Sequence, residues 1–241
     1  MNNCIIHPIP LWEMKMTKSA LTFRQGFEQT INPICYVWYI EGTKERIIVD
    51  AGLNTKHMSS LGAQAGKEIQ TIDTGLNRYG LTVNDIDIVI ITHLHSDHVG
   101  SAYRFSKARF LIQKRELDFG RNPHPAFASG YNREYYDTLN FQVIDGDFKV
   151  SDEVTALFTP GHTPGSQSVA VHTRNGTAVI SGCCSLRENF DPPASFKMDV
   201  IPSGTPSNAF ENYESLLRIK KLADIVIPNH DRAFLKVNDI P

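Results

Sequence analysis

The feature that most constrains this chain is a cluster of histidines directly after a buried strand. Residues 86–92 (IDIVIIT) form a continuous apolar run, which is typical of a strand covered on both faces. The next six residues supply three imidazoles and one carboxylate, from His93, His95, Asp97 and His98. Zn²⁺ and related first-row ions bind these groups. A polar surface loop is the alternative for an isolated HxH, but HxHxDH after such a strand predicts a metal site.

Two distant histidines occupy similar settings. His162 lies in TPGHTPG after the predicted strand 154–158, and His230 lies in PNHD after the apolar residues IVIP. Either histidine alone could be a hydrogen-bonded structural residue. Together with the first cluster they supply the ligands that a two-metal site requires. We therefore expect two divalent metal ions, with Zn²⁺ favoured and Fe, Mn or Co as alternatives. The other histidines, which lack such a setting, are interpreted as ordinary residues: His7, His57, His124 and His172.

The apolar pattern predicts an α/β layered architecture. The chain has 241 residues, 41% hydrophobic and 21% charged, which favours one domain over residues 1–241. Strands are expected at 33–40, 46–50, 86–92, 109–113, 141–145, 154–158, 167–172, 177–181 and 224–228, and helices at 66–80 and 207–223. Groups of strands that are followed by helices indicate layers of sheet and helix.

Charge and hydropathy narrow the expected partners. The formal net charge is −2 and the acids and bases are mixed along the chain, so no basic stripe for nucleic acid is expected. A small-molecule substrate is favoured. The first residues lack a basic segment followed by an apolar run, and no stretch approaches the ~18 apolar residues of a membrane span. These patterns predict a cytoplasmic protein with no membrane partner, whose four cysteines are thiols. The oligomeric state is left open.

The sequence resembles the metallo-β-lactamase superfamily, and within it most closely the N-acyl-homoserine lactonase group. The motifs that carry the resemblance extend over most of the chain: IVDAG at 48–52, THLHSDHVG at 92–100, IQKREL at 112–117, VIDGDFKV at 143–150, TPGHTPGSQS at 159–168 and PNHD at 228–231. The resemblance implies an αββα sandwich with the metals at one edge of the two sheets. It also implies that His93, His95 and His162 hold the first metal, that Asp97, His98 and His230 hold the second, and that Asp50 is a structural carboxylate beneath the histidine loop.

One departure from the family pattern concerns the ligand that bridges the metals. The family has an aspartate there, whereas this chain reads Ile180-Ser181-Gly182-Cys183-Cys184, with Cys183 in the aspartate's place. A thiolate is a good zinc ligand, so Cys183 is predicted to bind the second metal. Successive side chains of an extended strand point to opposite faces, so only one of the two cysteines can face the site. The alternatives are a buried Cys183 without a bridge, a shift of one residue onto Cys184, and a vicinal disulfide.

A second departure concerns the substrate side. Many lactonases of this group have a tyrosine shortly after the bridging aspartate, and this chain has none there. Tyr131, Tyr135 or Tyr136 could supply a phenol from another direction, although core packing is the alternative for each. Residues 11–30 have the apolar, irregular composition of a loop over a pocket, with plain packing as the alternative.

These residues together predict a metal-dependent hydrolase. A metal-held hydroxide would attack a carbonyl that the metals polarise, and Asp97 would orient the hydroxide and pass a proton to the leaving group. Ring opening of an N-acyl-homoserine lactone-like substrate, or of a related cyclic ester or amide, is the expected reaction. The alternatives are a glyoxalase-type thioesterase and a metal-binding or redox-sensing protein without catalysis.

Overall fold

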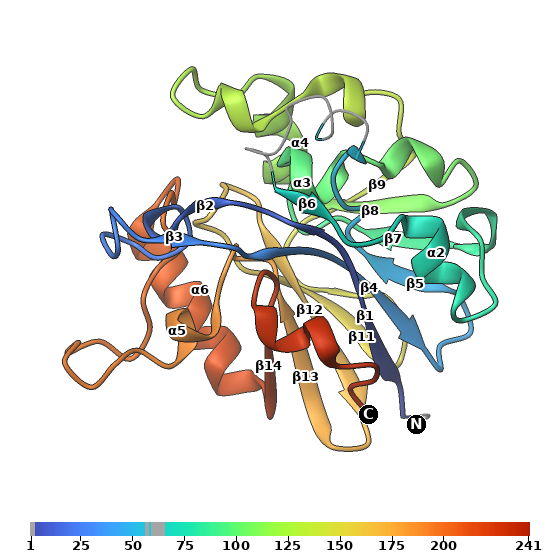
Figure 1. Cartoon of the computed structure of the whole chain (residues 1–241). Coiled ribbons are helices and arrows are strands. Elements are labelled where there is room, and N and C mark those ends of the chain that lie inside the picture. Colours follow the sequence, from blue (N-terminus) through green and yellow to red (C-terminus); the bar gives the residue numbers. More distant parts are fainter. Residues whose placement is uncertain (1–2, 56–57, 59–65) are drawn as a thin grey trace.

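Two β-sheets lie face to face, and helices cover the outer face of each sheet (Figure 1). The computed structural model describes residues 3–55, 58 and 66–241. The first sheet has the order β6-β1-β4-β5-β7-β8-β9, with bounds Lys67–Glu68, Ile5–Glu13, Ile34–Glu41, Ile47–Val49, Ile88–Ile90, Arg109–Gln113 and Phe141–Ile144. The second has the order β10-β11-β12-β13-β14, with bounds Phe148–Lys149, Val154–Phe158, Gln167–Thr173, Gly176–Ser181 and Ile225–Pro228.

The remaining elements are helices and one small strand pair. The strand pair is β2 (Met16–Thr17) with β3 (Thr30–Ile31). The α-helices are α2 (Ile72–Asn77), α3 (Ser96–Val99), α4 (Lys114–Arg121), α5 (Arg187–Phe190) and α6 (Ala209–Leu222). Short 3-10 turns lie at Lys18–Ala20, Val83–Asp85, Ala102–Arg104, Ala128–Gly130, Arg133–Tyr135 and Arg232–Lys236. In the described part of the chain, no helix is long and apolar enough to cross a membrane.

The layered arrangement follows from side-chain alternation along the buried strands. Ile88 and Ile90 of β7 belong to the apolar cluster between the two sheets, whereas Val89 and the following residue, Ile91, belong to the cluster under the helices. A third cluster packs β13 against α5 and α6, as at Val179 and Leu216. Each sheet is therefore apolar on both faces, which the αββα sandwich satisfies by covering both faces.

The direction of the strands brings several loops to one edge of the sandwich. Strands β5, β7 and β8 are parallel to one another, so their carboxyl ends lie together. In the second sheet β13 is parallel to β14, and β11 has the same direction because both β11 and β13 are antiparallel to β12. In open sheets of this kind, ligands bind outside the carboxyl ends of the strands.

The αββα prediction, the predicted strands and the helix at 207–223 are confirmed, whereas the other predicted helix differs and several short elements and strand β1 were not predicted. The predicted helix at 66–80 is wrong over much of its length, because residues 67–68 form β6 and the helix covers only Ile72–Asn77. Strand β1, which contains Pro8 and Pro10, was not predicted. Most of β1 pairs with β4 on one side only, and β6 reaches just Trp12 and Glu13 on the other. Prolines are tolerated there because β6 covers only the end of β1, which leaves most N–H positions on that side of the strand unused by the sheet.

Candidate metal centre

The first triad of candidate ligands comes from two loops at the carboxyl ends of strands. His93 and His95 follow β7, and His162 follows β11. One ligand atom from each residue lies within 4.8 Å of the others. His162 Nε2 is 3.2 Å from His95 Nδ1. Two nitrogens bound to one tetrahedral zinc would be about 3.4 Å apart, so this spacing fits a shared ion.

The second triad consists of Asp97, His98 and His230. The Oδ2 atom of Asp97 is 3.4 Å from His98 Nε2 and 3.7 Å from His230 Nε2. His230 follows β14, the edge strand of the second sheet, so this triad joins the loop after β7 to the loop after β14. The rings of His93 and His98 lie 4.0 Å apart between centroids, which makes the two triads neighbours.

The hydrogen bonds of the imidazoles leave one nitrogen of each free for an ion. His93 Nδ1 lies 3.1 Å from the Thr92 hydroxyl, His98 Nδ1 lies 2.7 Å from Asp50, and His230 Nδ1 lies 2.9 Å from the Ile34 carbonyl. Their Nε2 atoms are buried, and among the described residues they face only other candidate ligands and Cys184. Unsatisfied buried polar atoms are rare, and metal-binding histidines are normally oriented through their second nitrogen. The residues therefore fit a metal.

Electrostatics favour the metal-binding forms of His95 and Asp97. Burial, together with the nearby His162, lowers the pKa of His95 to about 3, so its imidazole is neutral at pH 7. Burial acts to raise the pKa of Asp97, but the charge and hydrogen bond of His98 hold it below its usual range. Asp97 is therefore a carboxylate at pH 7.

Asp50 is the buried carboxylate beneath the histidine loop, as the resemblance predicted. It accepts hydrogen bonds from the Thr92 N–H at 2.7 Å and the Thr92 hydroxyl at 2.9 Å, in addition to the contact with His98. Its φ is +61°, a left-handed conformation that is uncommon for residues other than glycine. Asp50 therefore fixes both the start of the loop and the orientation of one ligand.

A second buried carboxylate, Glu116 on α4, was missed by the sequence reasoning. It accepts hydrogen bonds from the Leu94 N–H at 2.9 Å, the Thr163 hydroxyl at 2.6 Å and the Gly165 N–H at 3.1 Å. Burial raises the pKa of Glu116. The side chain thus ties the loop of His93 and His95 to the loop of His162. The motif IQKREL contains Glu116, but nothing in that pattern indicates a contact with either loop.

The structure contradicts the placement predicted for Cys183. Its thiol lies 3.6 Å from the Thr159 carbonyl and belongs to the apolar cluster with Leu157, Val179 and Phe190. Burial raises its pKa to about 12. The prediction assumed an extended strand through both cysteines, but β13 ends at Ser181. The residue lies under the helix layer and does not face the candidate ligands.

Cys184 takes the position expected for Cys183. Its φ is +47°, so the chain turns at this residue and directs the thiol toward His162 and His230. Burial opposes ionisation, but these two imidazoles hold the pKa of the Cys184 thiol well below its usual range. All four cysteines are free thiols, so the structure contains no vicinal disulfide.

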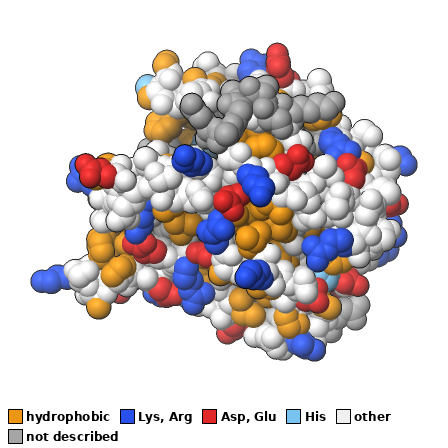
Figure 2. Space-filling model, viewed as in Figure 1, with side chains coloured by type: hydrophobic (Ala, Val, Ile, Leu, Met, Phe, Trp, Pro, Cys, Tyr) orange, Lys and Arg blue, Asp and Glu red, His pale blue; other side chains and the backbone are white. Residues whose placement is uncertain are grey.

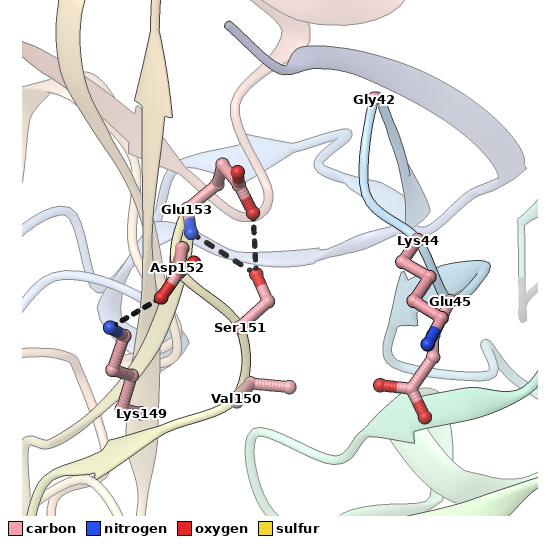
Figure 3. A pocket seen from close by; sticks show the side chains of 8 residues that line it. All are labelled: Gly42, Lys44, Glu45, Lys149, Val150, Ser151, Asp152 and Glu153. Atoms are coloured by element: carbon pink, nitrogen blue, oxygen red, sulfur yellow. Dashed lines mark hydrogen bonds and ion pairs between the residues drawn. The ribbon is translucent and has the colours of Figure 1, made fainter. Parts of the chain in front are cut away.

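A small apolar cavity adjoins the second triad. It has a volume of about 150 Å³ and is lined by Met14, Leu53, Asn54, Met58, Ser96, Asp97 and Tyr135. Residues 11–30 therefore contribute Met14 to a pocket, while Trp12 packs with Cys35 and Leu53. A larger cavity of about 530 Å³, shown in Figure 3, lies between the turn at Gly42–Glu45 and residues 149–153. None of its lining residues is a candidate ligand.

The three tyrosines considered on the substrate side have different roles. The Tyr131 hydroxyl donates to Glu116 at 3.3 Å, and the fully buried Tyr136 donates to the Gly120 carbonyl at 2.7 Å. Both phenols are therefore engaged in holding α4 and its loops. Tyr135 is half-buried and lines the cavity beside Asp97.

Replacing Glu116 by Gln tests its role as a clamp between the loops. The amide has one acceptor oxygen in place of two, so either the Leu94 side or the Thr163 and Gly165 side loses its acceptor. We expect a loss of about 1–3 kcal/mol in the free energy of unfolding and a ten- to hundredfold weaker metal affinity. Chemical denaturation and competition with a metal chelator measure these. Asp118→Asn, on the exposed face of the same helix, is the control, and equal behaviour of the two variants would reject the clamp.

Comparisons with known proteins agree with this geometry. The family model of the metallo-β-lactamase superfamily matches residues 32–230. An N-acyl homoserine lactonase of Bacillus cereus is 29% identical over 237 residues, which cover 91% of this chain and 87% of the relative. An N-acyl homoserine lactonase of Bacillus thuringiensis is 26% identical over 80% of this chain and 75% of its own length.

Solved structures show the same fold. A crystal structure described as a quorum-quenching N-acyl homoserine lactone lactonase superposes with a TM-score of 0.81 at 23% identity, covering 98% of this chain and 95% of that one. A probable metal-dependent hydrolase from Staphylococcus aureus superposes with a TM-score of 0.75 at 19% identity, covering 96% and 91%. The resemblance predicted from the motifs is confirmed, and the chain belongs to the metallo-β-lactamase superfamily.

Proposed function

We propose that this chain is a metal-dependent hydrolase that opens the ring of a lactone, with N-acyl-homoserine lactones as the first candidates. The observation that carries the proposal is the pair of adjacent ligand triads beside an apolar cavity. Several similar proteins are named N-acyl homoserine lactonases. A similar solved structure is described as having the product N-hexanoyl-L-homoserine at its catalytic metal centre.

The two triads would each hold one divalent ion. His93, His95 and His162 would hold the first, and Asp97, His98 and His230 the second. Imidazole and carboxylate ligands suit Zn²⁺ best, and also accept Fe, Mn and Co. Two such ions would lower the pKa of water and polarise a carbonyl oxygen.

Asp97 is the residue to which we assign proton transfer. Its side chain keeps 28% of its surface exposed, whereas His98 and His230 are nearly inaccessible. It also lines the apolar cavity, so a substrate held there would contact it. A carboxylate at this place can accept a proton and deliver it to the leaving alkoxide.

The cavity supports a substrate with a small apolar part. Met14, Leu53 and Met58 provide apolar walls, and methionines adapt to ligands of different shape. Tyr135 is the one tyrosine among the residues that line this cavity, and its hydroxyl has no hydrogen-bond partner among the described residues. We assign this phenol to the substrate carbonyl. Figure 2 shows acidic and basic side chains interspersed on the face that it displays.

Metal analysis with a hydrolysis screen tests the proposal as a whole. We expect about two metal equivalents per chain and turnover of lactones ahead of thioesters. His95→Ala and His162→Ala should each lose metal and hydrolysis, because each removes a ligand of the first triad. His172→Ala, at an exposed position of β12, is the control. Thioesters as the best substrates would favour the glyoxalase-type alternative, and bound metal without any turnover would favour a non-catalytic protein.

Asp97→Asn separates proton transfer from metal binding at the first triad. The amide keeps the shape of the side chain but accepts no proton, so turnover should fall about 10²- to 10⁴-fold. Metal at His93, His95 and His162 should remain. Elemental analysis measures the bound metal and steady-state kinetics measure kcat, with the exposed Asp199→Asn as control. Unchanged turnover at full metal content would show that Asp97 does not carry the proton.

Tyr135→Phe tests the assignment of the phenol. Losing a hydrogen bond to the reacting carbonyl oxygen should lower kcat by about 10²-fold with little change in KM. Tyr103→Phe, which alters an exposed tyrosine, is the matched control. A change in KM alone would show that Tyr135 contacts the bound substrate without assisting the reaction at its carbonyl.

A further inference from the structure

The thiol of Cys184 lies beside one imidazole from each triad. Its side chain hydrogen-bonds with His162 of the first triad and with His230 of the second. Cys184 does not belong to either triad, whose members are all mutually within 4.8 Å. A side chain that faces one ligand of each triad lies between the two candidate ions.

The backbone around Cys184 is built to hold this position. Its φ of +47° is left-handed, and the other two described residues with this feature outside glycine are Arg24 and Asp50. The next residue, Ser185, donates its N–H to Asn229 at 2.9 Å and accepts from the His230 N–H at 3.1 Å. Before it, a Cβ atom on Gly182 would lie 1.9 Å from the Gln167 carbonyl oxygen. The turn is thus locked to the loop of His230, and such strained residues cluster at functional sites.

The other buried thiols do not compete for this place. Cys183 lies in the apolar cluster under α6, and Cys35 donates to the Asp97 carbonyl at 3.0 Å. Cys4 belongs to the cluster between the two sheets. Cys184 is therefore the single thiol of the chain that faces the candidate ligand atoms.

We propose that Cys184 is a seventh ligand, a thiolate that bridges the two metal ions. This inference rests on the proposed two-metal site. Each triad supplies three ligands, and a four-coordinate ion with a thiolate bridge still receives water or substrate if it expands its coordination. A soft sulfur ligand also shifts the preference of the centre toward Zn²⁺ and Co²⁺ and away from Mg²⁺ and Mn²⁺.

Cobalt titration of the metal-free protein tests the bridge by absorption spectroscopy. We expect about two cobalt equivalents, visible d–d bands, and a sulfur-to-cobalt charge-transfer band that only a thiolate ligand produces. The charge-transfer band should be absent from Cys184→Ser and Cys184→Asp and present in Cys183→Ala and Cys35→Ala. Cys184→Asp should keep two cobalt ions, since its carboxylate can bridge, and this variant shows that loss of the band is not loss of the fold.

The outcomes distinguish this inference from the proposed function. Two bound cobalt ions without a charge-transfer band in the wild-type protein would overturn the bridge and leave the two-metal site standing. A band that is lost in Cys183→Ala or Cys35→Ala and kept in Cys184→Ser would assign the sulfur to a different cysteine and also overturn it. Failure of the wild-type protein to bind cobalt would reject the two-metal site itself, and with it the proposed function.

Discussion

The buried carboxylate of Asp50 holds the loop from which four of the candidate ligands come. It lies at the end of β5, the strand that pairs with β7. It accepts hydrogen bonds from the backbone N–H and the hydroxyl of Thr92. It also orients His98 through Nδ1. A charged acceptor in a water-excluded place forms strong hydrogen bonds, and leaving it without them would be costly. The histidine loop therefore has one low-energy arrangement before any ion binds.

Glu116 fixes the loop of His162 in place, as Asp50 fixes the loop that begins at Thr92. Its two oxygens accept from Leu94 on one side and from Thr163 and Gly165 on the other, so the two loops that form the first triad cannot move independently. Both carboxylates lie outside the triads, yet they set the distances within them. Supporting residues of this kind are commonly as important for metal affinity as the ligands.

Cys183 and Cys184 show which part of their placement strand geometry predicts and which part it does not. Alternation along an extended strand correctly implies that the two thiols diverge. The family pattern selected Cys183, but β13 ends at Ser181 and the left-handed turn at Cys184 directs Cys184 to the site instead. The turn depends on Asn229 and on the close passage of Gly182 over Gln167, contacts between residues far apart in the chain. No local pattern could have predicted them.

The sequence by itself determined the layers of sheet and helix, the strands whose ends carry ligands, and the six residues of the two triads, because apolar runs and the motifs that follow them are local patterns. The αββα sandwich came from the family resemblance that these motifs carry. Proline-containing β1 and the short helix α2 were not predicted, since their conformations depend on the strands that they pack against. Only the tertiary structure decided that Glu116 joins two ligand loops, that Tyr135 lines the cavity while Tyr131 and Tyr136 support α4, and that Cys184 faces the site. Each of these depends on side chains that meet across long stretches of chain, and folding alone brings them together.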